Sequence, residues 1–149
     1  METTASMIAP CEPSVLYEHV ELLDRYPVWM PLVHDARRVD DERGALAWTV
    51  ELRTRVGPLA RSKRLRMVRV AAEPDRSAVF ERSEVDGRSH SPWVLRADVA
   101  PVDGGSRLTM HLSYGGSLWT GGVLQRILDD EIRRGSEALL RLVSGEPRR

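Results

Sequence analysis

The chain has 149 residues, 42% of them hydrophobic and 30% charged, which suits a globular domain with its own core and excludes an extensively disordered protein. Its 22 basic and 22 acidic residues balance, so no overall charge favours nucleic acid. The N-terminal segment lacks the basic and apolar regions of a secretory signal, and the single cysteine, Cys11, permits no intrachain disulfide. These features predict a cytoplasmic protein with a single domain over residues 1–149.

The first 32 residues predict a strand, a helix and an aromatic bend. Thr3–Ala9 is a short extended segment, and Pro13 suits the start of a helix of about ten residues, whose apolar side chains recur at helical spacing. Pro27 and Pro31 then exclude a long helix. The large apolar residues around these prolines are Tyr26, Trp29, Met30 and Leu32. Such residues are costly in a surface loop, so we expect a bent element that caps one end of an apolar cavity.

Five consecutive segments between Ala45 and Tyr114 alternate between apolar and polar residues, as half-buried strands do. Short turn signals separate them. These signals are Gly57-Pro58, Glu73–Arg76, Asp86-Gly87 and Asp103–Gly105. Strands joined by such short turns predict a mostly antiparallel meander.

The segment after Tyr114 predicts the longest helix of the chain. Apolar residues recur every three or four positions up to Val143, which gives about 25 helical residues if the helix starts near Leu118. A twisted antiparallel sheet leaves its concave face uncovered. The long helix can lie across that face and enclose a cavity of the kind that binds small molecules.

Two stretches carry a resemblance to a known family: IAPCEPSVLYEHVELLDRYPVWMPLV near the start and LSYGGSLWTGGVLQRILDDEIRRGSEALLRLV near the end. Together with the element order, they make the whole chain resemble the START-like, Bet v 1-like (SRPBCC) superfamily, and within it the bacterial polyketide cyclase/dehydrase-type proteins. The resemblance implies an α+β helix-grip fold, in which a curved antiparallel sheet wraps around a long C-terminal helix and two short helices follow the first strand. It also implies a hydrophobic tunnel between sheet and helix. The family shares no universal catalytic motif, so the resemblance assigns no catalytic residue.

The alternation of each strand and the helical spacing assign a set of large side chains to the inner surface. They would line a ligand pocket or pack as ordinary core, and we favour a pocket for the set as a whole, with Trp29 near its mouth. The predicted pocket residues are Trp29, Trp48, Met67, Phe80, Trp93, Leu95, Met110, Leu112, Tyr114, Leu124 and Leu128.

A few polar residues share this inward alternation and are candidates for catalysis. Arg69 faces inward if its apolar neighbours on the strand do, and Arg82 and Glu84 face inward together. An inward arginine would stabilise a carboxylate or an enolate, whereas a Glu–Arg pair would neutralise itself. A slip of one residue in register reverses these assignments. His34 and Tyr114 are candidates for moving protons, although an exposed loop histidine is the commoner outcome.

Basic residues are concentrated between Leu52 and Ala72, with no acid among them. On two adjacent strands most of them would face outward, where they could dock a membrane surface, an acyl carrier protein or, less readily, nucleic acid. Cross-strand pairing with acids such as Glu81 and Glu84 would explain them without a partner. The residues concerned are Arg53, Arg55, Arg61, Lys63, Arg64, Arg66 and Arg69.

Three functions therefore stay open. The first is a binding or carrier protein for a small hydrophobic ligand such as a lipid or a polyketide-like aromatic compound. The second is a polyketide cyclase, aromatase or dehydratase acting in the same cavity, and the third is a regulatory protein that docks through its basic strands. Because the predicted inner face is nearly all apolar and shows no acid–base pair, we favour binding. The four histidines lack metal-ligand spacing and no cofactor motif is seen, so we expect neither a metal nor a cofactor.

Overall fold

A computed structural model of the chain describes residues 2–56, 58–115 and 122–144. Seven strands form one antiparallel sheet in the order β1-β7-β6-β5-β4-β3-β2. The strands are β1 (Glu2–Ala9), β2 (Val33–Glu42), β3 (Ala45–Val56), β4 (Leu59–Glu73), β5 (Ser77–Arg82), β6 (Trp93–Val102) and β7 (Gly105–Tyr114). The helices are α1 (Pro13–Val20), the 3-10 helix η1 (Leu23–Val28) and α2 (Gly122–Val143).

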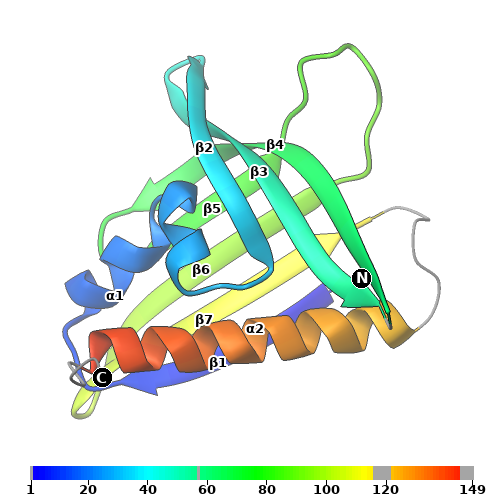
Figure 1. Cartoon of the computed structure of the whole chain (residues 1–149). Helices are drawn as coiled ribbons and strands as arrows, with labels where there is room; N and C mark the ends of the chain where they lie inside the picture. The colour runs from blue at the N-terminus through cyan, green and yellow to red at the C-terminus, as the bar shows by residue number, and fades with distance from the viewer. Residues whose placement is uncertain (1, 57, 116–121, 145–149) are drawn as a thin grey trace.

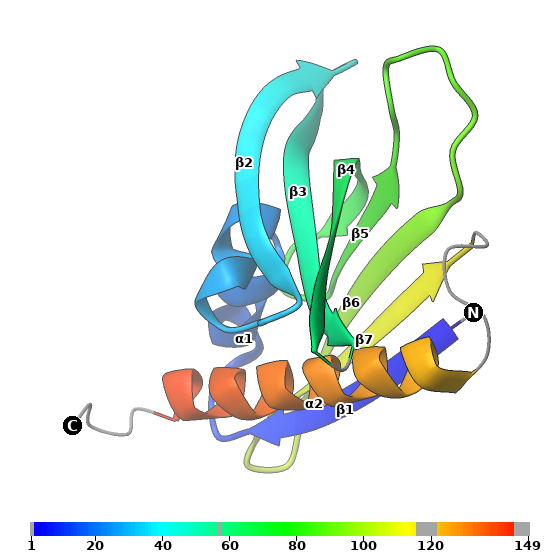
Figure 2. The same ribbon diagram turned by 45° about the vertical axis from the view of Figure 1, so that its right-hand side comes forward.

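Helix α2 lies across the concave face of the curved sheet. Figures 1 and 2 show it running alongside β1, while the end of β3 and the start of β4 curve over to reach it and α1 and η1 occupy one end of the fold. The two edge strands, β1 and β2, are thus joined by the short helices. This arrangement confirms the predicted α+β helix-grip fold. No helix within the described residues is long and apolar enough to cross a membrane.

Strand β2 is the element that the alternation of the sequence does not predict. Its pairing with β3 shifts between Val33 and Asp35, so the inward position moves to Ala36, and the apolar period of two is lost. Most of its other residues are charged, as is common in strands that protect the edge of a sheet. A two-residue turn of Arg43 and Gly44, both with positive φ, then leads into β3.

The aromatic bend between the two prolines folds as η1, and its polar atoms are satisfied by the end of α1. The Tyr26 hydroxyl donates to the carbonyl of Val20 at 2.9 Å, and the Trp29 indole N–H donates to the carbonyl of His19 at 3.1 Å. The two rings lie 5.0 Å apart and both are buried. These bonds explain how such large aromatic residues occupy a chain segment that Pro27 keeps from forming a long helix.

Helix α2 packs against the bend at Gly135, which lies beside Met30. A Cβ at Gly135 would lie 3.4 Å from Met30 Cα and 3.5 Å from Met30 Cβ, which are ordinary contact distances. We therefore expect Gly135→Ala to raise the free energy of unfolding by about 0.5–1 kcal/mol, because alanine loses less backbone entropy in a helix. Urea denaturation measures this. Gly135→Val is the matched control and should destabilise, because its branches cannot fit; an alanine variant less stable than the parent would contradict the expectation.

Candidate ligand cavity

An apolar cavity lies where the sheet, the bend and α2 meet. The cavity volume is about 40 Å³ when only positions for the centre of a water molecule are counted. The volume free of protein atoms is about 470 Å³, and this larger value includes a part open to solvent. The cavity is therefore narrow but continuous with the surface. The lining residues are Leu23, Met30, Leu32, Val33, Val50, Leu52, Leu65, Met67, Trp93, Leu95, Leu112 and Ile132.

The strand alternation explains why this lining is apolar. Val50 and Leu52 of β3 face the same side as Leu65 and Met67 of β4, because Val50 is the backbone partner of Leu65 and Trp48 that of Met67. On the same face, in the part of the sheet nearer β1, Leu95 of β6 is the backbone partner of Leu112 of β7. In α2, Ile132 is 1% exposed and closes the cavity from the helix. All the lining side chains that the structure describes are hydrophobic, and only Trp93 carries a polar atom.

Four of the predicted pocket residues lie in this lining: Met67, Trp93, Leu95 and Leu112. Four others are buried elsewhere in the core, namely Trp29, Trp48, Phe80 and Met110. Tyr114 stacks on Trp93, with ring centroids 5.0 Å apart. The side chains of Leu124 and Leu128 lie outside the described residues. The part of each residue in ligand binding stays a prediction.

The placement of Trp29 differs from the expectation that it lies near the mouth. Its indole is 2% exposed and bound to the end of α1, whereas Met30 and Leu32 of the same bend reach the cavity. The apolar character of the bend was visible in the sequence, but not which of its side chains turns inward. Val50, Leu52 and Leu65 were absent from the predicted set, although they share the alternation of Trp48 and Met67. That alternation is the signal that could have found them.

The candidate catalytic arginine of β4 holds the short helices instead of facing the cavity. Arg69 Nη1 donates to the carbonyl of Glu21, the C-cap residue of α1, at 2.9 Å. The Tyr17 hydroxyl adds a second link, to the carbonyl of Ser77 on β5, at 3.0 Å. Arg69 thus faces the inner side, as its alternation predicts, but its described contact is with the backbone of α1.

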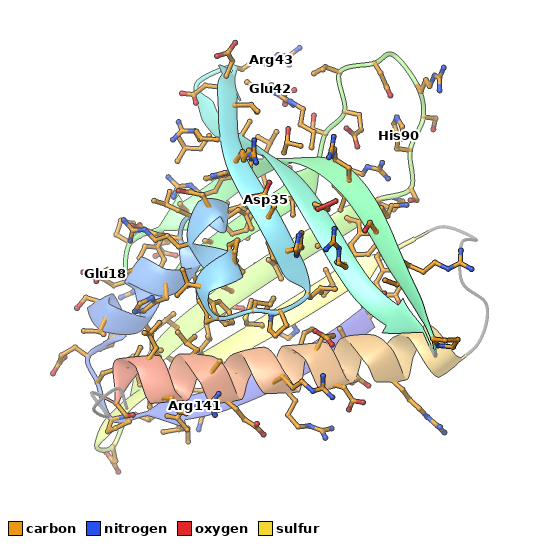
Figure 3. All side chains as sticks on the ribbon, viewed as in Figure 1. Glu18, Asp35, Glu42, Arg43, His90 and Arg141 are labelled. Atoms are coloured by element: carbon orange, nitrogen blue, oxygen red, sulfur yellow. The ribbon has the colours of Figure 1, made fainter. Side chains whose placement is uncertain are left out.

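Arg82 is engaged by the loop between β5 and β6. Its Nε donates to Glu84 Oε2 at 2.6 Å, and its Nη1 donates to the carbonyl of Ser91 at 3.2 Å. Arg82 Nη2 also lies 3.2 Å from Nδ1 of His90, which Figure 3 shows in that loop. The Glu–Arg pair that was one alternative for this site is therefore present. His34 lies on β2 with its ring half exposed, 3.9 Å from Glu51, and does not sit in a loop.

The strand register divides the basic residues between the two faces of the sheet, with Arg53, Arg64 and Arg66 outward and the other described members inward. Lys63 belongs to the inward set of β4, with Leu65 and Met67, and its Nζ lies 6.0 Å from the centroid of the Trp93 ring. Arg61 shares the same alternation, and its opposite partner is the buried Thr54. The consecutive basic residues of β4 obscure this alternation in the sequence. The inward positions of Leu65 and Met67 indicate that Lys63 also faces inward.

The outward members of the basic set include residues with counter-charges close by. Arg66 pairs with Glu42 of β2 at 3.0 Å, and Arg53 lies 3.7 Å from Glu51 of its own strand. Figure 3 shows Glu42 at the end of β2. The acids that pair differ from the predicted ones, since Glu84 binds Arg82. Arg64 is exposed, and the Arg55 side chain lies outside the described ones. A docking surface at these residues stays a prediction.

A metal site is not apparent among the residues that the structure describes, because no three His, Cys, Asp or Glu side chains are grouped to hold an ion. Thr3 of β1 donates to Asp129 of α2, and this link joins the edge strand to the helix. Burial raises the pKa of the nearby Tyr114 hydroxyl, and the Asp129 carboxylate raises it further.

Residues 1–143 match the family described as polyketide cyclase / dehydrase and lipid transport. No curated protein matches the chain.

Solved structures share the fold at low sequence identity. A protein from Thermus thermophilus is similar with a TM-score of 0.75 and 15% identity, over 98% of this chain and 100% of that one. A START superfamily protein from Mycobacterium smegmatis has a TM-score of 0.74 and 11% identity, over 95% of this chain and 96% of that one. BexL, a di-domain ARO/CYC from the BE-7585A biosynthetic pathway, has a TM-score of 0.72 and 14% identity, over 99% of this chain and 51% of that one. The family match spans nearly the whole chain and the fold agrees with it, so this protein belongs to the polyketide cyclase / dehydrase and lipid transport family.

Proposed function

We propose that this protein binds a small hydrophobic molecule, such as a lipid or a polyketide-like aromatic compound, in the cavity between the sheet and α2. The observation that carries the proposal is the lining itself, in which twelve hydrophobic side chains from five strands, the bend and α2 face one space. Transfer of apolar surface from water into such a space is favourable by roughly 25 cal/mol per Å². A void with apolar walls also holds water poorly, so a guest need displace little.

The cavity must widen to hold a guest larger than a few atoms, and two flexible side chains in its walls allow this. Met30 lies on the bend and Met67 on the sheet, so flexible, unbranched side chains border the space from two sides. Rotation of these side chains changes the shape of the cavity without moving the backbone. We expect the guest to be accommodated in this way, at a cost that its own buried apolar surface offsets.

Binding is favoured over catalysis because three of the four candidate catalytic groups are engaged away from the cavity. Arg69 binds the C-cap of α1, Arg82 binds Glu84, and His34 lies on β2 beside Glu51. A cyclase or dehydratase needs an acid–base group or an anion stabiliser at the reacting atoms. Among the described side chains that line the cavity, the one polar atom is the Trp93 indole nitrogen.

Val50→Phe is expected to weaken binding of the neutral fluorescent probe N-phenyl-1-naphthylamine by about tenfold or more, which corresponds to about 1.4 kcal/mol. Val50 is 2% exposed and lines the cavity, so the added ring occupies the space of the guest. Fluorescence titration measures the change. Native mass spectrometry before and after organic extraction should show a hydrophobic compound on the parent protein and less of it on the variant.

Val99→Phe is the matched control, because Val99 is 5% exposed on the inner side of β6 but away from the cavity lining. It carries the same overpacking cost, roughly 1–3 kcal/mol, without blocking the space. Its probe affinity should stay within about twofold of the parent, a difference of only about 0.4 kcal/mol. Equal probe binding by the Val50 and Val99 variants, with both folded by circular dichroism, would overturn the proposed function. Leu95→Phe provides a second and milder block of the same cavity.

A further inference from the structure

A lysine stands at the border of the apolar cavity. The backbone partner of Lys63 in β3 is Leu52, which lines the cavity, and its ammonium lies 6.0 Å from the ring centroid of Trp93, which also lines it. Pairing between β4 and β5 ends at Met67, so Lys63 lies beyond the paired region and its side chain extends to β6. A cation at this distance from an indole ring is attracted by the ring's negative face.

Trp93 carries a buried hydrogen-bond donor that no described group accepts. Its side chain is 8% exposed, and its indole nitrogen is buried without a partner in the part of the chain that the structure describes. The indole groups of Trp29 and Trp48, by contrast, donate to the carbonyl of His19 and to the carboxylate of Asp24. A buried donor left unpaired costs about 1–3 kcal/mol. Native proteins rarely keep one without a reason.

Among the described residues, two charged groups act on Lys63. The Arg82 guanidinium has the larger effect, and the Glu84 carboxylate, which raises the Lys63 pKa, is itself bound to Arg82 at 2.6 Å. Burial lowers the pKa of the Lys63 ammonium, and the positive charge of Arg82 lowers it further. Both effects mean that this ammonium would gain from an added negative charge.

We propose that the hydrophobic guest carries an anionic oxygen headgroup, with a carboxylate as the simplest case, which lies at Lys63 while the apolar part fills the cavity. A turn of the Trp93 ring brings its buried indole N–H to the cavity wall, where the headgroup accepts the hydrogen. This inference rests on the proposed function and names the chemical class of its ligand. A charge-assisted hydrogen bond is stronger than a neutral one, and the headgroup would supply both missing partners at once. The apolar walls would select the rest of the molecule by size.

Decanoate and decanol test the headgroup, because they share a chain and differ in the charge of the oxygen. Each competes with N-phenyl-1-naphthylamine in a fluorescence displacement titration at low salt. For the parent protein we expect decanoate to displace the probe at a lower concentration than decanol. Lys63→Met should reduce this preference by about tenfold or more, the factor that corresponds to about 1.4 kcal/mol.

Arg64→Met is the matched control, since it removes the same charge from the next residue of β4, which is exposed on the other face. It should leave the decanoate preference unchanged. Trp93→Phe keeps a ring against Tyr114 but removes the donor, and should weaken both ligands. Decanol binding with no preference for decanoate, or a preference that survives Lys63→Met, would overturn the headgroup site and leave the proposed cavity standing. Displacement by neither ligand would overturn both.

Discussion

Phe80→Ala is expected to lower the free energy of unfolding by about 3–5 kcal/mol, the range found when a buried aromatic side chain is truncated. The Phe80 ring is fully buried and lies edge-on to two others, with centroids 5.6 Å from Trp48 and 6.2 Å from Tyr26. Its loss removes hydrophobic burial and leaves a hole between the sheet and the bend. Chemical denaturation followed by circular dichroism measures the change.

This loss should also reach the cavity, because Tyr26 belongs to η1 and the same element carries Leu23 into the lining. Probe affinity is therefore expected to fall along with stability. Val79→Ala is the matched control, because Val79 directly precedes Phe80 on β5 and is only partly buried on the opposite face. Val79→Ala should lower the free energy of unfolding by well under half as much as Phe80→Ala. A loss below about 1.5 kcal/mol for Phe80→Ala would show that the aromatic cluster is loosely packed.

The regular parts of the fold follow directly from the sequence. The alternation of β6 and β7 places Trp93, Leu95 and Leu112 inward, and the helical spacing of α2 places Ile132 and Leu139 against the sheet. Such patterns are local, since the side-chain period of a strand or helix depends only on its own backbone. They predicted an antiparallel sheet covered by one long helix with a cavity between the two layers, and the family resemblance added the helix-grip arrangement.

The composition of the cavity lining depends on contacts between distant segments, and these leave little trace in a local pattern. Trp29 turns away from the cavity because the carbonyl of His19 accepts its indole hydrogen, an interaction set by how η1 meets α1. Strand β2 was missed because a register shift after Val33 interrupts its alternation. Lys63 is different, since the inward alternation of Leu65 already placed it inside, and the neighbouring arginines concealed this.

Arg82→Met is expected to lower the free energy of unfolding by about 3 kcal/mol, because it removes one partner of a largely buried ion pair. The side chains of Arg82 and Glu84 are only 9% and 17% exposed. Without the guanidinium, Glu84 keeps one described hydrogen bond, a 3.4 Å contact from the backbone N–H of Arg66, and Ser91 loses its donor. Denaturation measures the loss of stability, and hydrogen exchange over residues 83–92 should show a loosened loop.

Arg96→Met is the matched control, since Arg96 forms the same pair two residues apart with Asp98 at 2.9 Å, but its side chain is 52% exposed. Exposed pairs of this kind are screened by water and add little to stability, so the two variants should differ clearly. Replacing Glu84 together with Arg82 should recover part of the loss, because no unpaired carboxylate then remains. If Arg82→Met instead proves as mild as Arg96→Met and leaves the loop unchanged, Arg82 is not needed to hold the loop. Its guanidinium would then be free to stabilise an anion, and the cyclase alternative would regain the group that its mechanism requires.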